Sequence, residues 1–292
     1  MYQTFGDGQG DSDSQGKLSS LKLPILQDKA VLDLGCNEGF FCNVAHEMGA
    51  SKVVGTDIQA EMVYKAGDRF PDIDFQLQDW KDLADMDGVF DVVLCLSAFH
   101  YAKDKEQLLS DIANKLSDDG LFVLEAGIVE GDQEEWVDVE RFSDTVQHPT
   151  KTALDNLLRK FFSIRCAGPS VNQKGDPVPR FVYHCTKLKP VALIISGKSK
   201  DGKTTLAHMI GARTVCWDHI FTKNKLGDTD KIDQITDQLI KDGKADDLVS
   251  MVMEEVDQIS GLVVLEGYGF GLLPIQKELE DRGFIVWSTI RS

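Results

Sequence analysis

The amino-acid sequence predicts an α/β protein built from two three-layer αβα domains. Short apolar runs rich in β-branched residues alternate with helical stretches along most of the 292-residue chain, which is the pattern of βαβ units with a mostly parallel sheet. This alternation starts again directly after Lys189-Pro190. A chain of 292 residues is also long enough for two domains with separate cores. We therefore expect an N-terminal arm or lid at 1–20, a first domain at 21–189 and a second, smaller domain at 190–292.

The first domain is expected to hold a sheet of seven strands. Two apolar runs flank a Gly/Pro loop at 175–179, so they are expected to form an antiparallel pair at the sheet edge. Residues 6–20 are rich in Gly, Asp, Ser and Gln and predict a loop or mobile arm, with order beginning at Leu21. The predicted strands are 31–35, 52–57, 74–79, 91–97, 120–127, 161–168 and 180–188.

The second domain repeats the pattern with four predicted strands at 191–196, 214–218, 262–267 and 284–290. Between the second and third of them, residues 228–260 place apolar side chains at helical spacing among many acidic residues. This spacing predicts an amphipathic pair of helices that covers the second sheet.

The charge balance limits the class of partner. The chain has 48 Asp and Glu against 31 Lys and Arg, a formal net charge of -17. Such a surface repels phosphate polymers and anionic lipid, so we expect no nucleic-acid partner. No apolar run is long enough to span a bilayer and the N-terminal sequence is polar, so we expect no membrane span and a cytoplasmic location. The six cysteines are scattered without CxxC spacing and predict buried, reduced thiols.

Acidic residues follow the first three predicted strands. The first strand runs into Asp33-x-Gly35-x-x-x-Gly39, a glycine turn before a helix that lacks the dinucleotide pattern GxGxxG. Asp57 ends the second strand, where a carboxylate can accept two hydrogen bonds from a ribose diol, and Asp79-Trp80 follows the third, suited to an adenine amine and its ring. Each acid alone is equally explained as a helix cap. Because they share the carboxyl edge of one sheet, we expect a single ligand site.

This order of motifs resembles the class I S-adenosylmethionine-dependent methyltransferases over residues 1–188, and it implies their Rossmann-like sheet and S-adenosylmethionine as cofactor. By this resemblance the glycine turn contacts the methionyl part, Asp57 and Ile58 the ribose and adenine, and Asp79 and Trp80 the adenine edge. The further cofactor-binding candidates are Asp33, Gly35, Cys36, Asn37, Gly39, Phe40 and Ser97.

Three short segments carry a narrower resemblance. YQTFGDG at the start, LDLGCNEGFF at 32–41 and LSAFHY at 96–101 are similar to the methyltransferase half of bacterial O-antigen chain-terminating methyltransferase/kinase enzymes. The likeness implies that Tyr2, Gln3 and Phe5 fold over the cofactor as a lid; the alternative is a disordered tail. His100 is a candidate catalytic residue that takes a proton from a hydroxyl or orients an acidic acceptor; the alternative is a structural His bonded to a backbone carbonyl.

The second domain opens with a phosphate-binding pattern. After the strand at 191–196, the sequence matches G-x-x-x-x-G-K-[ST] and leads into a helix, so we expect ATP there, with Lys203 on the phosphates and Thr204 on Mg²⁺. Asp218 and Glu266 are expected at later strand ends as further catalytic and Mg²⁺-binding residues, although Asp218 alone is also explained as a helix cap. The nucleotide-binding candidates are Gly197, Lys198, Ser199, Lys200, Asp201, Gly202, Lys203, Thr204 and Thr205.

This second pattern resembles P-loop small-molecule kinases over about 190–292. Two departures stand against it. The chain given has no strand after 284–290, and its second half has few arginines to stabilise a transferring phosphoryl group. The kinase half of the O-antigen enzymes also has a different, protein-kinase fold, for which this sequence holds no HRD or DFG motif.

Three hypotheses about function follow. In the first, a bifunctional enzyme phosphorylates and then methylates a sugar, glycan or small molecule. In the second, a methyltransferase carries a P-loop domain that binds nucleotide only for regulation or assembly. In the third, both domains are non-enzymatic ligand-binding scaffolds. The sequence leaves the acceptor and the oligomeric state open.

Overall fold

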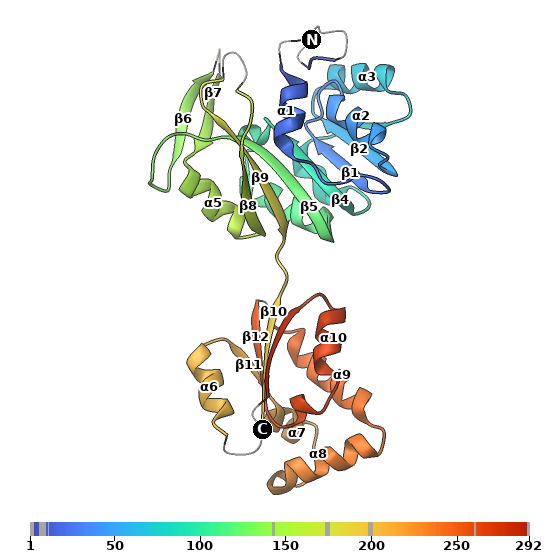
Figure 1. The fold of residues 1–292 in the computed structure, drawn as a ribbon, viewed down its shortest axis with the longest axis vertical. Coiled ribbons are helices and arrows are strands. Elements are labelled where there is room, and N and C mark those ends of the chain that lie inside the picture. The colour runs from blue at the N-terminus through green and yellow to red at the C-terminus, as the bar shows by residue number, and fades with distance from the viewer. Residues whose placement is uncertain are drawn as a thin grey trace. The chain divides into compact units, whose positions relative to one another are not determined.

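The computed structural model describes residues 3–5, 10, 12–141, 144–172, 176–197, 201–259 and 261–290. The chain divides into two compact units, Met1–Leu188 and Lys189–Ser292 (Figure 1). Each unit holds its own sheet and its own buried core.

The first unit is a seven-stranded mixed sheet with the order β3-β2-β1-β4-β5-β9-β8. The first five strands are parallel, and β9 runs antiparallel to both β5 and β8. The predicted antiparallel pair is confirmed, but β9 lies inside the sheet and only β8 forms its edge. The strands are β1 (Ala30–Leu34), β2 (Lys52–Asp57), β3 (Asp74–Leu77), β4 (Phe90–Leu96), β5 (Leu116–Gly127), β8 (Phe162–Pro169) and β9 (Arg180–Lys187).

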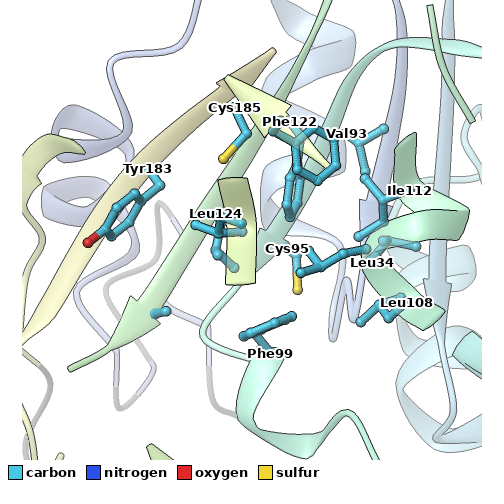
Figure 2. Packing of buried hydrophobic residues seen from close by; sticks show 14 of the residues in the cluster. Leu34, Val93, Cys95, Phe99, Leu108, Ile112, Phe122, Leu124, Tyr183 and Cys185 are labelled. Carbon is cyan, nitrogen blue, oxygen red and sulfur yellow. The ribbon is translucent and has the colours of Figure 1, made fainter. Parts of the chain in front are cut away.

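Helices cover both faces of this sheet, because alternate strand residues point to opposite sides. Leu32 and Leu34 face a cluster with α4 and α5, whereas Val31 faces a cluster with α1 and α2. The helices are α1 (Ser14–Leu21), α2 (Phe40–Glu47), α3 (Ala60–Arg69), α4 (Lys105–Lys115) and α5 (Lys151–Arg159). Figure 2 shows the first of these clusters, with labelled side chains Leu34, Val93, Cys95, Phe99, Leu108, Ile112, Phe122, Leu124, Tyr183 and Cys185.

The prediction of a loop throughout 6–20 is wrong for residues 14–20, which belong to α1. Asp13 caps the helix by accepting a hydrogen bond from Gly16 N at 2.8 Å. Lys17, in its middle, is buried against acidic and hydroxyl side chains of the sheet. Because these partners are distant in sequence, the composition of the segment gives no sign of them. A two-stranded hairpin, β6 (Trp136–Arg141) and β7 (Asp144–Pro149), was also not predicted.

The second unit is a parallel sheet with the order β11-β12-β10-β13. Its strands are β10 (Val191–Ser196), β11 (Arg213–Cys216), β12 (Leu262–Glu266) and β13 (Ile285–Ile290), which confirms the four predicted strands. One correction concerns the second: β11 ends at Cys216, so Asp218 lies in the first turn of a helix and not at a strand end.

Helices pack on this second sheet through Leu248, Val252 and Ile275, among other residues. The helices are α6 (Lys203–Ile210), α7 (Trp217–Lys223), α8 (Ile232–Lys241), α9 (Ala245–Val256) and α10 (Ile275–Asp281). The predicted helical pair within 228–260 is confirmed as α8 and α9.

Two smaller expectations concern membranes and cysteines. In the part of the chain that the structure describes, no helix combines the length and the apolarity needed to cross a membrane. All six cysteines are free thiols; four are buried, Cys216 is half-buried and Cys166 is exposed.

Candidate functional site

A cavity of about 930 Å³ lies at the carboxyl ends of β1 to β4 in the first unit. Segments that are far apart in the sequence meet there, as expected for the carboxyl edge of a parallel sheet. The predicted residues that line it are Gln3, Asp33, Gly35, Asn37, Asp57, Ile58, Asp79, Trp80 and Ser97. Phe5, Cys36, Gly39, Phe40 and His100 do not line it, and Tyr2 lies outside the described residues.

The glycine turn after β1 follows a backbone path that requires positive φ at Gly35 (+78°) and Gly39 (+84°). A Cβ on Gly35 would lie 3.2 Å from Ala98 Cβ and 3.5 Å from the Trp80 ring, inside the cavity wall. A Cβ on Gly39 would lie 2.8 Å from the Phe75 ring. Gly35 therefore keeps the cavity open, whereas Gly39 allows the helix start to pack against β3.

Asp33 is a buried carboxylate with a weak donor. Its side chain is 2% exposed, and the Cys42 thiol donates to it over 3.5 Å. Burial raises the pKa of Asp33 to about 7, the charge of Asp57 adds to the rise and the Cys42 thiol opposes it. A cationic group in the cavity next to Asp33 would stabilise its ionised form. S-adenosylmethionine carries two cationic groups, so this carboxylate fits that cofactor.

Asp57 and Asp79 are held by backbone N–H groups. Asp57 accepts from Asn37 N at 3.0 Å and from Gln59 N at 2.9 Å, and each oxygen retains capacity for a further donor. Asp79 accepts from Lys81 N at 3.2 Å and caps the short helix Trp80–Asp85. Its pKa is lowered chiefly by this backbone hydrogen bond. Asp79 therefore both caps this helix and lines the cavity.

The N-terminal residues 3–5 are attached to the start of α2. Gln3 accepts from Phe40 N at 3.0 Å and donates to Cys36 O at 3.3 Å, so it satisfies a free donor of the helix end. The Phe5 ring packs 5.7 Å from that of Phe40, and the Arg69 guanidinium lies 4.0 Å from its centre. These contacts hold Gln3 at the cavity wall.

A buried ion-pair network reaches the cavity wall through Lys17 and Ser97, and no local sequence signal indicates it. Lys17 Nζ lies 3.1 Å from Glu125 Oε2 and donates to Ser97 Oγ at 2.6 Å. Ser97 in turn donates to Glu125, and its φ of +59° is one that non-glycine residues rarely adopt. Burial lowers the pKa of Lys17, and Glu125 opposes this.

The network extends behind the cavity to β9. Arg180 lies 3.7 Å from Glu125 and binds Asp176 through two hydrogen bonds of 2.6 and 2.7 Å. Ser170 donates to the second oxygen of Glu125. The two cations and two carboxylates are all buried and balance in charge.

His100 is nearly buried, and the cavity wall at this point is formed by its neighbour Tyr101. The His100 ring centre lies 4.1 Å from that of Tyr101 and 5.0 Å from that of His148 on β7. A catalytic role for His100 stays a prediction.

In the second unit, the starts of α6 and α7 and the end of β12 bring predicted residues together. Thr204 Oγ1 donates to the Glu266 carboxylate, 3.2 Å from each oxygen, and Glu266 is 3% exposed. Burial and the charge of Glu266 raise the pKa of Asp218, and Lys203 opposes the rise. Lys203 is buried, while Gly202 precedes it with a φ of +74°.

The rest of the phosphate-binding pattern is only partly described. Gly197, Asp201 and Thr205 belong to the described residues, but Lys198, Ser199 and Lys200 do not. Within the described ranges, no group of three or more His, Cys, Asp or Glu side chains could hold a metal ion.

Comparison with known proteins identifies the first unit. Residues 32–124 match the family model of the methyltransferase domain, so the first unit contains a methyltransferase domain. A tRNA U34 carboxymethyltransferase from Nautilia profundicola is 28% identical over 142 residues, 46% of this chain and 47% of its own length. The chain spans about half the length of the first curated relatives it matches.

Two solved structures are similar to the chain. A putative S-adenosylmethionine-dependent methyltransferase from Listeria monocytogenes is 21% identical with a TM-score of 0.48, covering 60% of this chain and all of that one. A co-crystal structure of WbdD with a kinase inhibitor is 22% identical with a TM-score of 0.47, covering 63% of this chain and 43% of that one.

Proposed function

We propose that the chain is an S-adenosylmethionine-dependent O-methyltransferase. One observation carries the proposal: residues at the ends of three different strands line one cavity in a domain that matches the methyltransferase family model. These residues are Asp33, Gly35, Asp57 and Trp80. When bound, S-adenosylmethionine supplies a methyl group on a sulfonium, which a nucleophilic oxygen can accept without a metal.

The residues of the chain have separate tasks in this proposal. Asp33 stabilises positive charge, Asp57 accepts from the ribose hydroxyls, and Trp80 stacks on the adenine. Gln3 holds the N-terminal residues against the same cavity. These contacts fix the methyl donor in place, so that proximity supplies much of the rate.

Cofactor binding tests this proposal directly. Titration with S-adenosylhomocysteine should quench Trp80 fluorescence in the wild type and leave a Trp80→Phe variant silent. Asp57→Ala should weaken binding by about 10- to 100-fold, because it removes hydrogen bonds to a charged acceptor. The control is Asp74→Ala, an exposed acid on β3 outside the cavity, which should bind normally. Failure of the wild type to bind S-adenosylhomocysteine would refute the proposal.

We propose that the methyl acceptor is a small molecule or a glycan. The acceptor would carry a phosphate if the second unit phosphorylates it first. The net charge of -17 favours this over a nucleic-acid acceptor. Methyl transfer to a panel of sugars, sugar phosphates and unmodified tRNA, followed with a labelled methyl donor, compares the alternatives. Saturable methylation of tRNA alone would refute this choice of acceptor.

For the second unit we propose binding of ATP with Mg²⁺ and phosphoryl transfer to a hydroxyl. The contact between Thr204 and Glu266 supports it, because it joins a phosphate-loop hydroxyl to a buried carboxylate on the next strand of the sheet. Lys203 would bind the phosphates, and Asp218 would accept the proton of the hydroxyl.

Lys203→Ala tests this second activity. The substitution should lower the affinity for Mg²⁺-ATP by more than about tenfold. It should leave methyl transfer unchanged, since the methyltransferase cavity lies in the other unit. ATP binding without turnover in the presence of any acceptor would favour the alternative in which the P-loop serves regulation or assembly. The absence of ATP binding by the wild type would refute both.

A further inference from the structure

The buried ammonium group of Lys17 has a donor that the described structure does not use. A lysine ammonium has three N–H donors. Two have partners, Ser97 Oγ at 2.6 Å and Glu125 Oε2 at 3.1 Å. The side chain is 4% exposed, yet Lys17 belongs to the wall of the 930 Å³ cavity. Of the two buried cations in this network, only Lys17 lines the cavity, since Arg180 lies behind it.

Lys17 acts through its charge on Asp33, whose pKa it lowers, but its hydrogen-bond partners do not lie on the nucleoside side of the cavity. Asp57, Gln78 and Trp80 line the side beneath β2 and β3, which the proposed function gives to the nucleoside. Lys17 is bonded instead to Ser97 at the end of β4 and to Glu125 on β5. A ligand group at this end would meet one ammonium donor and a wall of hydroxyl groups, which includes Ser12 and Ser14.

We propose that Lys17 binds the methyl acceptor and selects one with an anionic oxygen, a carboxylate or a phosphate ester. The inference rests on the proposed methyltransferase function. Hydrogen bonds from a charged donor to an anion are stronger than those to a neutral hydroxyl, and most so in a site with little water. An anionic partner would also offset the loss of hydration that burial imposes on the ammonium group.

Among the described residues, the cavity wall offers the carboxylates Asp33, Asp57, Asp79 and Asp104 but no histidine as a base, and an anionic nucleophile needs neither. None of the described residues that line the cavity is a histidine, and His100 lies behind Tyr101. A neutral hydroxyl would need a base to accept its proton during transfer. An anionic oxygen forms its bond to the methyl carbon while the bond from that carbon to sulfur breaks and the sulfur keeps the electron pair. No proton is released, so no base is needed.

The test observes Lys17 directly. We would record the ¹⁵Nζ NMR signal of Lys17 in the full chain saturated with S-adenosylhomocysteine, assigned with Lys17→Arg, and add acetate, methyl phosphate or acetamide. Acetamide matches acetate in shape but has no charge. We expect acetate, methyl phosphate or both to shift the signal saturably and acetamide to leave it in place; the tighter anion identifies the acceptor class.

A variant pair controls for folding and for net charge. Lys17→Met alone leaves Glu125 without its nearest cation, so the double variant Lys17→Met/Glu125→Gln removes both charges. It should bind S-adenosylhomocysteine within about threefold of wild type but bind the anion about 10- to 100-fold more weakly. Lys22→Met removes one charge from an exposed site outside the cavity next to α1 and should change neither affinity.

The outcomes separate the two levels of the argument. A chain that does not bind S-adenosylhomocysteine overturns the proposed function and this inference with it. A chain that binds S-adenosylhomocysteine but shows no anion response, an equal response to acetamide, or undiminished anion affinity in the double variant overturns the inference alone.

Discussion

Asp33 gives the most direct test of the electrostatics of the cavity. Its pKa is about 7 in the folded chain, chiefly because of burial, against an ordinary value of 3.8. The folded state therefore binds more protons than the unfolded state between about pH 4 and pH 7, and the free energy of unfolding falls as the pH rises through this window. Each pH unit is worth ~1.4 kcal/mol, so the ionised carboxylate costs the empty protein at most about 4 kcal/mol above pH 7.

Asp33→Asn removes this penalty because an amide does not ionise. The variant should be less sensitive to pH between 4 and 7, and at pH 8 it should be more stable than wild type by up to about 4 kcal/mol. Hydrogen exchange of the β1 amides measures this for the first unit alone, with Asp74→Asn as the exposed control. A wild-type stability that does not fall between pH 5 and pH 8 would refute the reasoning.

The same residue links cofactor binding to pH. A bound cation favours ionised Asp33, so binding of S-adenosylhomocysteine, which retains an ammonium group, should release a proton near pH 6 and tighten as the pH rises to 8. Calorimetry in two buffers with different ionisation enthalpies counts the protons. Asp33→Asn should abolish the release and weaken binding; equal proton release by the variant would show that another group titrates.

Further predictions concern four other positions. Gly39→Ala should lower the free energy of unfolding by roughly 2–4 kcal/mol in urea titrations, from the positive φ and the clash with Phe75. Gly67→Ala, in α3 with no atom near the added methyl, should instead be neutral or gain up to about 1 kcal/mol. Gln3→Leu removes a buried helix cap and should cost about 1 kcal/mol of the same free energy and weaken binding of S-adenosylhomocysteine. Glu266→Gln should reduce the Mg²⁺ dependence of ATP binding, followed by fluorescent-nucleotide titration, and an unchanged Mg²⁺ response would contradict its proposed role.

The features predicted from sequence are those with local signals. Buried parallel strands are continuous apolar runs, so β1 and β4 could be found without contacts, and the acids that follow strands were placed at one sheet edge by topology alone. Asp218 marks the limit of this method. The apolar residues before it extend from β11 into the first turn of α7, and no local signal separates a strand end from a helix start there.

The features that were missed depend on distant partners. Lys17 looks like a solvated residue in a polar segment, and its burial depends on Glu125, 108 positions away, and on Ser97, 80 positions away. Glu125 in turn is one polar residue near the end of the otherwise apolar run at 120–127, and nothing in the adjacent sequence indicates its partner. A buried charge is tolerated only with its partner, so neither residue could be assigned from its own neighbourhood.

The two parts of the cavity differ in the same way: one is built by local sequence motifs and the other by residues that are distant in sequence. The half beneath β1 to β3 is made by motifs that each lie within a few residues of a strand end, which is why a nucleoside cofactor could be inferred from sequence. The half beneath β4 and β5 is made by α1 and by the network of Lys17, Ser97 and Glu125, which only the folded chain assembles. The net charge of -17 acts on polyanions at the protein surface and does not set the local charge of this half, whose own charges are buried and balanced in pairs. Acceptor choice should then be altered by substitutions in α1 that leave cofactor affinity unchanged, whereas substitutions in the glycine turn should alter cofactor affinity first.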